Sequence, residues 1–164
     1  MSNSLSPSVQ AACLGAVAGM RSMGAPALVS AHLTRDGHTP PPALMQSPLK
    51  WLASPTTALV FKFLGAGEVV GDKLPKTPSR LAPGPLFGRA LFGSLCGAAL
   101  CLDEGESPAL GAALGAASAV ASAFAFYHLR HALTYDIGLP DLPVALAEDA
   151  LAYGGGWKAL TTAA

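Results

Sequence analysis

Charge is scarce in this sequence, and so are aromatic side chains. Of the 164 residues, 12% are charged and 7% are aromatic, whereas 51% are hydrophobic and 18 are glycine. A soluble domain carries roughly 25% charged residues, because a small globule has much surface to keep solvated. Small and apolar residues are instead typical of helices that pack closely within a membrane. The composition therefore predicts an all-α fold, a polytopic membrane helical bundle, and the length predicts a single domain over residues 1–164.

An excess of one charge sign is also missing. The chain has 10 basic and 10 acidic residues, for a formal net charge of zero. Nucleic acid needs a positively charged stripe, so it is excluded as a partner. The first twelve residues contain no Lys or Arg, although a signal peptide begins with positive charge, so we expect the first apolar stretch to be retained. The partners that fit are the lipid bilayer and a small solute or ion, with multi-pass insertion in the inner (plasma) membrane of the cell.

Motifs for metal or cofactor chemistry are absent from the sequence as well. Cys13, Cys96 and Cys101 lie in apolar stretches and are odd in number, which argues against a disulfide framework. His128 and His131 are three apart, but no third ligand is near in sequence, so we assign them to a membrane interface. No phosphate-binding glycine loop or nucleophile motif occurs in the required context. We predict neither metal nor cofactor, and favour a protein that is not an enzyme.

Five apolar stretches predict five short membrane spans. The fourth is the clearest, because residues 109–127 contain no charge and approach the ~20 residues that cross a bilayer. The first contains Arg21, Gly24 and Pro26 within six residues, which predicts two half-helices that meet at a break. The last contains three consecutive glycines and admits a second break. The predicted spans cover residues 9–33, 56–74, 86–102, 108–133 and 143–160.

The loops between the predicted spans alternate in charge. Residues 73–89 are basic, residues 103–106 are acidic, and residues 128–131 are basic again. Basic loops stay in the cytoplasm, so this alternation predicts a cytoplasmic N-terminus and an external C-terminus.

Glycines recur four residues apart, a spacing that puts both on one face of a helix. Such pairs let two helix backbones approach closely inside a membrane. They predict tight packing, and Ser118 and Ser122 add small polar contacts. Because a bundle of so few spans encloses little space of its own, we also expect a homo-oligomer, with a dimer favoured. The pairs are Gly15/Gly19, Gly67/Gly71, Gly84/Gly88, Gly93/Gly97 and Gly111/Gly115.

Charged residues inside the predicted spans are the candidate functional residues, because each costs a few kcal/mol to insert. Glu68 and Asp72 share one helix face, whereas the adjacent Glu148 and Asp149 point about 100° apart and cannot face the same partner. Arg21, beside the break, could clamp an anionic group or pair with Glu68 or Glu148. The set that could line a pathway for a substrate or ion is Arg21, Glu68, Asp72, Arg89, Glu148 and Asp149.

Several motifs together resemble the DUF4126 family of uncharacterised bacterial membrane proteins. They are AGMRSMGAP at residues 18–26, GEVVGDKLP at 67–75, PSR at 78–80, PGPLFGR at 83–89 and LPDLPVALAED at 139–149. The resemblance covers nearly the whole chain. It implies a membrane location and no particular activity. The residues that it singles out are those flagged above, together with Arg80.

Three functions are compatible with this pattern. The first is a small transporter or channel, in which intramembrane arginines and acids line a polar path. The second is a non-catalytic membrane scaffold or accessory subunit, in which the same charges form salt bridges. The third, less favoured, is a lipid-active enzyme in which Asp72, Arg80 and Arg89 handle a headgroup phosphate.

Overall fold

The computed structural model describes residues 5–71 and 81–162, and within these ranges the chain is helical with no strand. The all-α fold class is therefore confirmed. The four later predicted spans correspond to α4, α5, α6 and α7. The elements are α1 (Pro7–Met20), α2 (Gly24–Leu33), α3 (Pro42–Met45), the 3-10 helix η1 (Pro48–Ala53), α4 (Pro55–Gly71), α5 (Pro83–Asp103), α6 (Pro108–His131), the π-helix η2 (Ala132–Asp136) and α7 (Asp141–Thr161).

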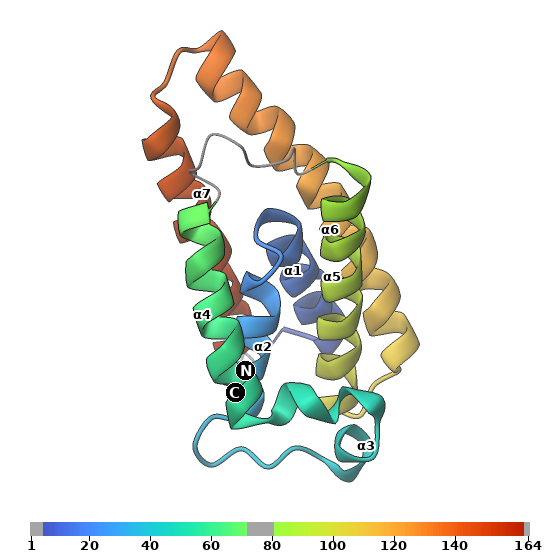
Figure 1. The fold of residues 1–164 in the computed structure, drawn as a ribbon. Coiled ribbons are helices and arrows are strands. Elements are labelled where there is room, and N and C mark those ends of the chain that lie inside the picture. The colour runs from blue at the N-terminus through green and yellow to red at the C-terminus, as the bar shows by residue number, and fades with distance from the viewer. Residues whose placement is uncertain (1–4, 72–80, 163–164) are drawn as a thin grey trace.

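Helices α1 and α2 form a hairpin inside the bundle (Figure 1). The start of α1 and the chain beyond α2 both contact the segment that joins α5 to α6. Ser8 donates a hydrogen bond to Glu106 at 2.8 Å, and His38 lies 3.0 Å from Asp103. Both open ends of the hairpin therefore lie at one end of the molecule. The predicted break is confirmed, but α1 and α2 do not continue each other as one span over residues 9–33.

Local sequence explains why the chain breaks between α1 and α2. Arg21 caps α1 with an extended backbone, at φ −136° and ψ 104°. Pro26 then occupies the first turn of α2, where its missing amide donor is no loss. In one continuous helix the same proline would remove an interior hydrogen bond. The break thus follows from residues 21–26 alone.

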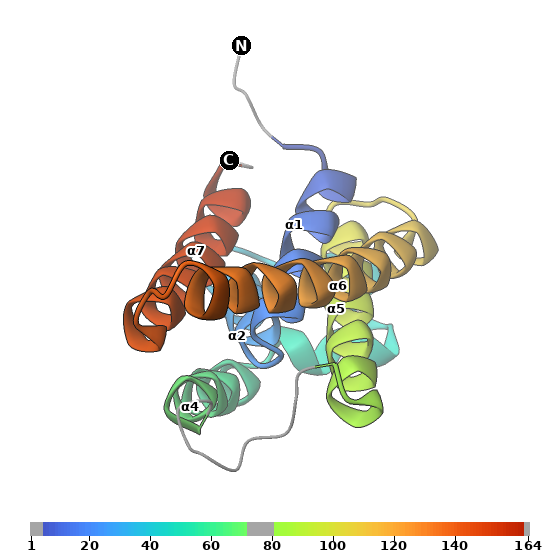
Figure 2. The same ribbon diagram turned by 90° about the horizontal axis from the view of Figure 1, so that it is seen from above.

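Helices α4 to α7 surround this hairpin (Figure 2). Glu68 contacts Ser22 while Gly65 lies against Ala27, so α4 runs antiparallel to α2. Helix α7 runs parallel to α2, because Asp149 meets Arg21 and Gly156 lies against Leu28. Helix α7 is continuous through Gly154, Gly155 and Gly156, so the second break that these glycines admit does not occur. The packing of α7 against α1 and α2 offsets the weak helix propensity of these three glycines.

Some of the predicted glycine pairs form the closest helix contacts. A Cβ atom placed on Gly93 would lie 2.6 Å from the carbonyl oxygen of Gly115. A Cβ atom placed on Gly97 would overlap the carbonyl oxygen of Gly111. Helices α5 and α6 therefore pack backbone to backbone, and Gly15 and Gly19 bring α1 equally close to α6.

Other predicted contacts have mixed outcomes. Ser122 donates to the Ala16 carbonyl at 2.8 Å, as expected of a small polar contact on α6. Gly67, Gly84 and Gly88 have no described atom within 4 Å of their Cβ positions, so they make no close helix contact within the described part of the chain.

The directions of the helices decide which segments lie at the same end of the bundle. The N-terminal end of α1, the α5–α6 loop and the C-terminal end of α7 lie together, opposite the end that carries Arg130 (Figure 1). This differs from the predicted arrangement, in which the N-terminus lies beside the Arg130 loop. The side of a membrane on which each end lies stays a prediction.

Candidate functional site at the hairpin tip

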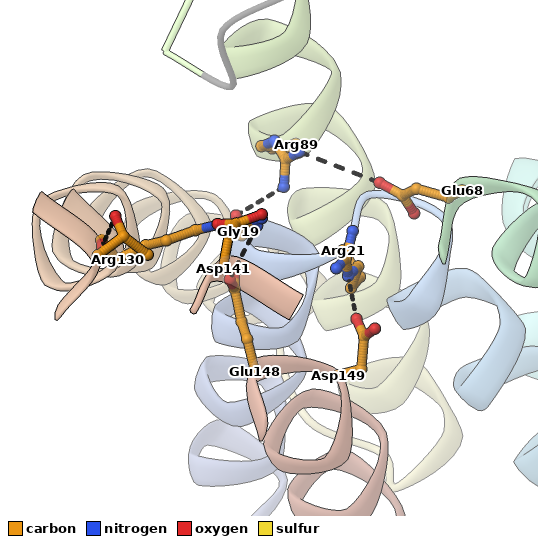
Figure 3. A network of polar contacts seen from close by, with 9 residues as sticks. Gly19, Arg21, Glu68, Arg89, Arg130, Asp141, Glu148 and Asp149 are labelled. Carbon is orange, nitrogen blue, oxygen red and sulfur yellow. Dashed lines mark hydrogen bonds and ion pairs between the residues drawn. The ribbon is translucent and has the colours of Figure 1, made fainter. Parts of the chain in front are cut away.

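Residues 21–23 form the hairpin tip, in which Ser22 and Met23 are half-buried. Arg21 has no exposed surface. Charged side chains from α4, α5 and α7 converge on this turn (Figure 3). The turn interrupts the helical hydrogen bonds, so its backbone groups need partners from other elements.

Asp149 of α7 holds the Arg21 side chain. The Arg21 Nε donates to Asp149 Oδ1 at 2.5 Å, and the two side chains are 0% and 11% exposed. A hydrogen bond between two buried, oppositely charged groups is among the stronger polar contacts in a protein. The sequence predicted Glu68 or Glu148 as the partner of Arg21, and the structure has Asp149 instead.

Glu68 of α4 binds the N-terminal end of α2. Its Oε1 accepts from the Ser22 backbone amide at 2.8 Å and from the Ser22 hydroxyl at 2.7 Å. Its Oε2 accepts from the Met23 amide at 2.8 Å. These amides begin the half-helix and have no partner within it, and the helix dipole favours a negative charge there. Glu68 thus occupies an anion-binding position with the protein's own carboxylate.

Arg89 of α5 completes the other side of the break. Its Nη1 donates to the Gly19 carbonyl oxygen at 2.7 Å, at the C-terminal end of α1, where a positive charge is favoured. Its Nη2 lies 4.0 Å from Glu68 Oε1. Both half-helix ends are therefore occupied by a side chain of opposite charge, and these two side chains are close to each other.

A second cluster lies between the end of α6 and the start of α7. Arg130 donates through Nε and Nη2 to the two carboxylate oxygens of Asp141, at 2.9 and 2.7 Å. Its Nη1 lies 3.7 Å from Glu148 Oε2. Adjacent Glu148 and Asp149 therefore face two different arginines, which confirms that they do not share a partner.

The structure brings together five of the six predicted pathway residues, in two neighbouring clusters (Figure 3). Asp72, the sixth, lies outside the described residues, as does Arg80. Sequence reasoning missed the role of Ser22 and of the Gly19 carbonyl. Their position beside the break could have indicated this role, because a helix interruption leaves backbone donors and acceptors without hydrogen-bond partners.

Tyr153 was also missed. It lies four residues after Asp149 on α7 and packs against Gly24. Its hydroxyl is buried and has no hydrogen-bond partner among the described residues. The spacing from Asp149 was the signal, since residues four apart share a helix face.

The chemistry open to this site is electrostatic. Among the described residues no group of three or more His, Cys, Asp and Glu side chains is placed to hold a metal ion. The tip instead offers amide donors and arginines to an anion, and a carbonyl and carboxylates to a cation.

Comparison with known proteins places the chain in a family. No curated protein and no solved structure matches it. A family model described as a domain of unknown function (DUF4126) matches residues 9–163, which is nearly the entire chain. The protein is therefore a member of the DUF4126 family.

Proposed function

We propose that this protein is a multi-pass membrane protein in which α4, α5, α6 and α7 cross the bilayer and the α1–α2 hairpin enters it without crossing. Helices α5 and α6 support this, since both are long and apolar enough to span. Of the most apolar 18-residue stretch of α6, only 28% is buried inside the protein. The remaining apolar residues of this stretch therefore need an apolar environment outside the protein.

The outer surface of the other two helices fits the same environment. Helix α4 has 17 residues and α7 contains four charged residues, so neither helix is identified as a membrane span by its length and hydropathy. Both nevertheless expose large apolar side chains, a surface that monomeric soluble proteins rarely have. These include Leu59, Phe63 and Leu64 on α4, and Leu142, Leu146 and Leu151 on α7.

We further propose that the protein transports a small solute or ion along a polar path through the hairpin tip. The observation that carries this proposal is the pair of half-helix ends buried among Arg21, Glu68, Arg89 and Asp149. Discontinuous helices with such ends form the solute sites of many membrane transporters. The second cluster, with Arg130 and Glu148, extends the path toward one end of the bundle.

Glu68 is the group that would change state during transport. As a carboxylate it holds the amides of Ser22 and Met23 and lies near Arg89. Protonation would remove its charge and weaken these charge-assisted contacts. A small anion could then take its place at the N-terminus of α2, where helix ends favour negative charge. Proton movement and solute movement would thus be linked at one carboxyl group.

The test is flux through purified protein in liposomes that enclose a pH-sensitive dye, under an imposed pH gradient and with a panel of small anions outside. Glu68→Gln keeps the shape of the side chain but cannot lose a proton, so the flux should be abolished in a folded protein. Glu104→Gln is the matched control, because Glu104 is an exposed acid in the α5–α6 loop. Unchanged flux in Glu68→Gln would count against transport through this site.

A membrane scaffold or accessory subunit is the second candidate. It is favoured by the direct pairing of Arg21 with Asp149, with no exposed surface on the arginine. In that case the parent protein would show no flux above empty liposomes, and Arg21 and Glu68 variants would lose stability or assembly first. The homo-oligomer, with a dimer favoured, stays a prediction and is checked in the same preparations by mass measurement.

A further inference from the structure

A groove of about 600 Å³ lies on the outer side of the bundle, between α2, α4 and α7. It adjoins the hairpin tip, because Tyr153 lines the groove and also packs against Gly24, but none of the charged residues of the tip lines it. The floor of the groove is made of small side chains, which leaves room for an occupant. Surface clefts of about 300–1,000 Å³ with an apolar lining and few polar groups are typical of small-molecule sites. The floor residues are Ala27, Ala31, Gly65 and Ala66.

Lys62 and Tyr153 contribute an ammonium and a hydroxyl to this groove, and neither is paired within the described part of the chain. Lys62 of α4 is exposed and has no ion pair or hydrogen bond there. The Tyr153 hydroxyl is buried and also has no hydrogen-bond partner among the described residues. It lies against Gly65, where an added Cβ would be 3.0 Å from the hydroxyl oxygen.

The positions of these groups fit one ligand with a polar head. Helices α4 and α7 run antiparallel, and Gly65 faces Tyr153. Lys62 on α4 and Trp157 on α7 therefore both lie about one turn further toward the same end of the groove. An ammonium and an indole thus mark one end, a phenol follows one turn inside, and small apolar residues cover the remaining length.

We propose that this groove binds an apolar monocarboxylate of the fatty-acid class. The carboxylate accepts hydrogen bonds from the Lys62 ammonium and the Tyr153 hydroxyl, and the apolar body covers the floor residues. One cation and one hydroxyl donor match the two oxygens of a single carboxylate. An ammonium in an apolar groove without a counterion is costly, so charge complementarity favours an anionic occupant over a neutral one. The proposal rests on the proposed membrane insertion, which puts the groove against lipid, but it does not rest on the proposed transport.

Trp157 supplies a direct readout of this groove. The chain has two tryptophans, so Trp51→Phe leaves Trp157 as the sole reporter. The purified variant in nanodiscs of zwitterionic lipid is titrated with 2-bromodecanoate, whose bromine quenches tryptophan on contact, and separately with its neutral methyl ester. Saturable quenching is expected for the acid. Its half-saturation should be about tenfold or more below that of the ester, as a charge-assisted hydrogen bond allows.

Three variants on this background identify the polar head. Lys62→Met keeps an unbranched apolar side chain without charge and should abolish the difference between acid and ester. Tyr153→Phe should raise the half-saturation concentration of the acid several-fold. Lys158→Met, the matched control, removes an exposed lysine next to Trp157 that does not line the groove, and should change nothing.

Three results would overturn the proposal. If Lys62→Met is quenched by the acid like its parent, the probe only partitions into lipid. If acid and ester quench the parent equally, the groove has no preference for an anion. If neither probe quenches Trp157, a phospholipid or a second copy of the chain covers the groove.

Discussion

At the scale of single residues, the Arg21–Asp149 contact decides how the hairpin tip is held. Taking two charges out of water costs several kcal/mol per ion, and their attraction repays this only when the geometry is good. The Nε–Oδ1 distance of 2.5 Å and the burial of both side chains meet that condition. Loss of one partner is much more costly than loss of both, because it leaves the other charge buried alone.

Arg21→Met should therefore lower the free energy of unfolding by about 3–5 kcal/mol. The double variant Arg21→Met/Asp149→Leu should recover much of this loss, because it leaves neither member of this pair buried without the other. Equilibrium unfolding in mixed micelles measures both. A double variant as unstable as the single one would show that the contact with Asp149 is not what holds Arg21.

At the scale of helices, glycine has two different consequences in this chain. Where backbones touch, as at Gly97 of α5 and Gly111 of α6, no larger residue fits. Where the Cβ position is open, as at Gly84, glycine only weakens the helix, by about 1 kcal/mol relative to alanine. The spacing of four residues is the same in both cases, so only the neighbours across the interface distinguish them.

Gly97→Ala should separate α5 from α6 and lower the unfolding temperature, whereas Gly84→Ala should leave it unchanged or raise it. A thiol-reactive fluorescent dye reports this well, because Cys96 and Cys101 have no exposed surface until α5 unpacks. Equal melting temperatures in the two variants would contradict the backbone contact between α5 and α6.

The glycine triplet of α7 provides a second test on adjacent residues. A Cβ on Gly156 would lie 2.5 Å from the Leu28 Cδ1 atom, whereas Gly154 and Gly155 face open space. Gly155→Ala should stabilise α7 by up to about 1 kcal/mol, because alanine favours the helix. Gly156→Ala should destabilise it, because Leu28 must move. The same dye assay ranks the two variants, and the reverse ranking would place the other face of α7 against α2.

At the scale of the whole molecule, the returning hairpin changes the relation of the two termini. Contacts of Ser8 and His38 with the α5–α6 segment put both ends of the hairpin on one side. In the proposed membrane arrangement four crossings follow, an even number, so α1 begins and α7 ends on the same side. A first span that crossed fully would put the termini on opposite sides.

Reporter fusions at the N-terminus and at the C-terminus should therefore locate to the same side of the membrane. A third reporter inserted after Glu104, in the α5–α6 loop, should share that side. A reporter inserted at Gly138, between η2 and α7, should locate to the opposite side and serves as the control. Termini on opposite sides would show that the hairpin does not return.

The sequence by itself determined the features that depend on local chemistry. Low charge and abundant small residues indicated packed helices, and Arg21 to Pro26 contain everything that ends one helix and begins the next. The sequence also showed which charged residues would need a partner, because an isolated charge in an apolar stretch is costly whatever the fold. These residues are Arg21, Glu68, Arg89, Glu148 and Asp149.

Only the tertiary structure decided how these pieces combine. The direction of α2 after the break depends on which helices it packs against, and local residues do not encode that. The partner of Arg21 lies 128 positions away, so the sequence predicted Glu68 or Glu148, and only the packing of α7 showed that Asp149 is the acid that contacts Arg21. Likewise, the continuity of α7 depends on packing against α1 and α2, which outweighs the weak helix propensity of three glycines.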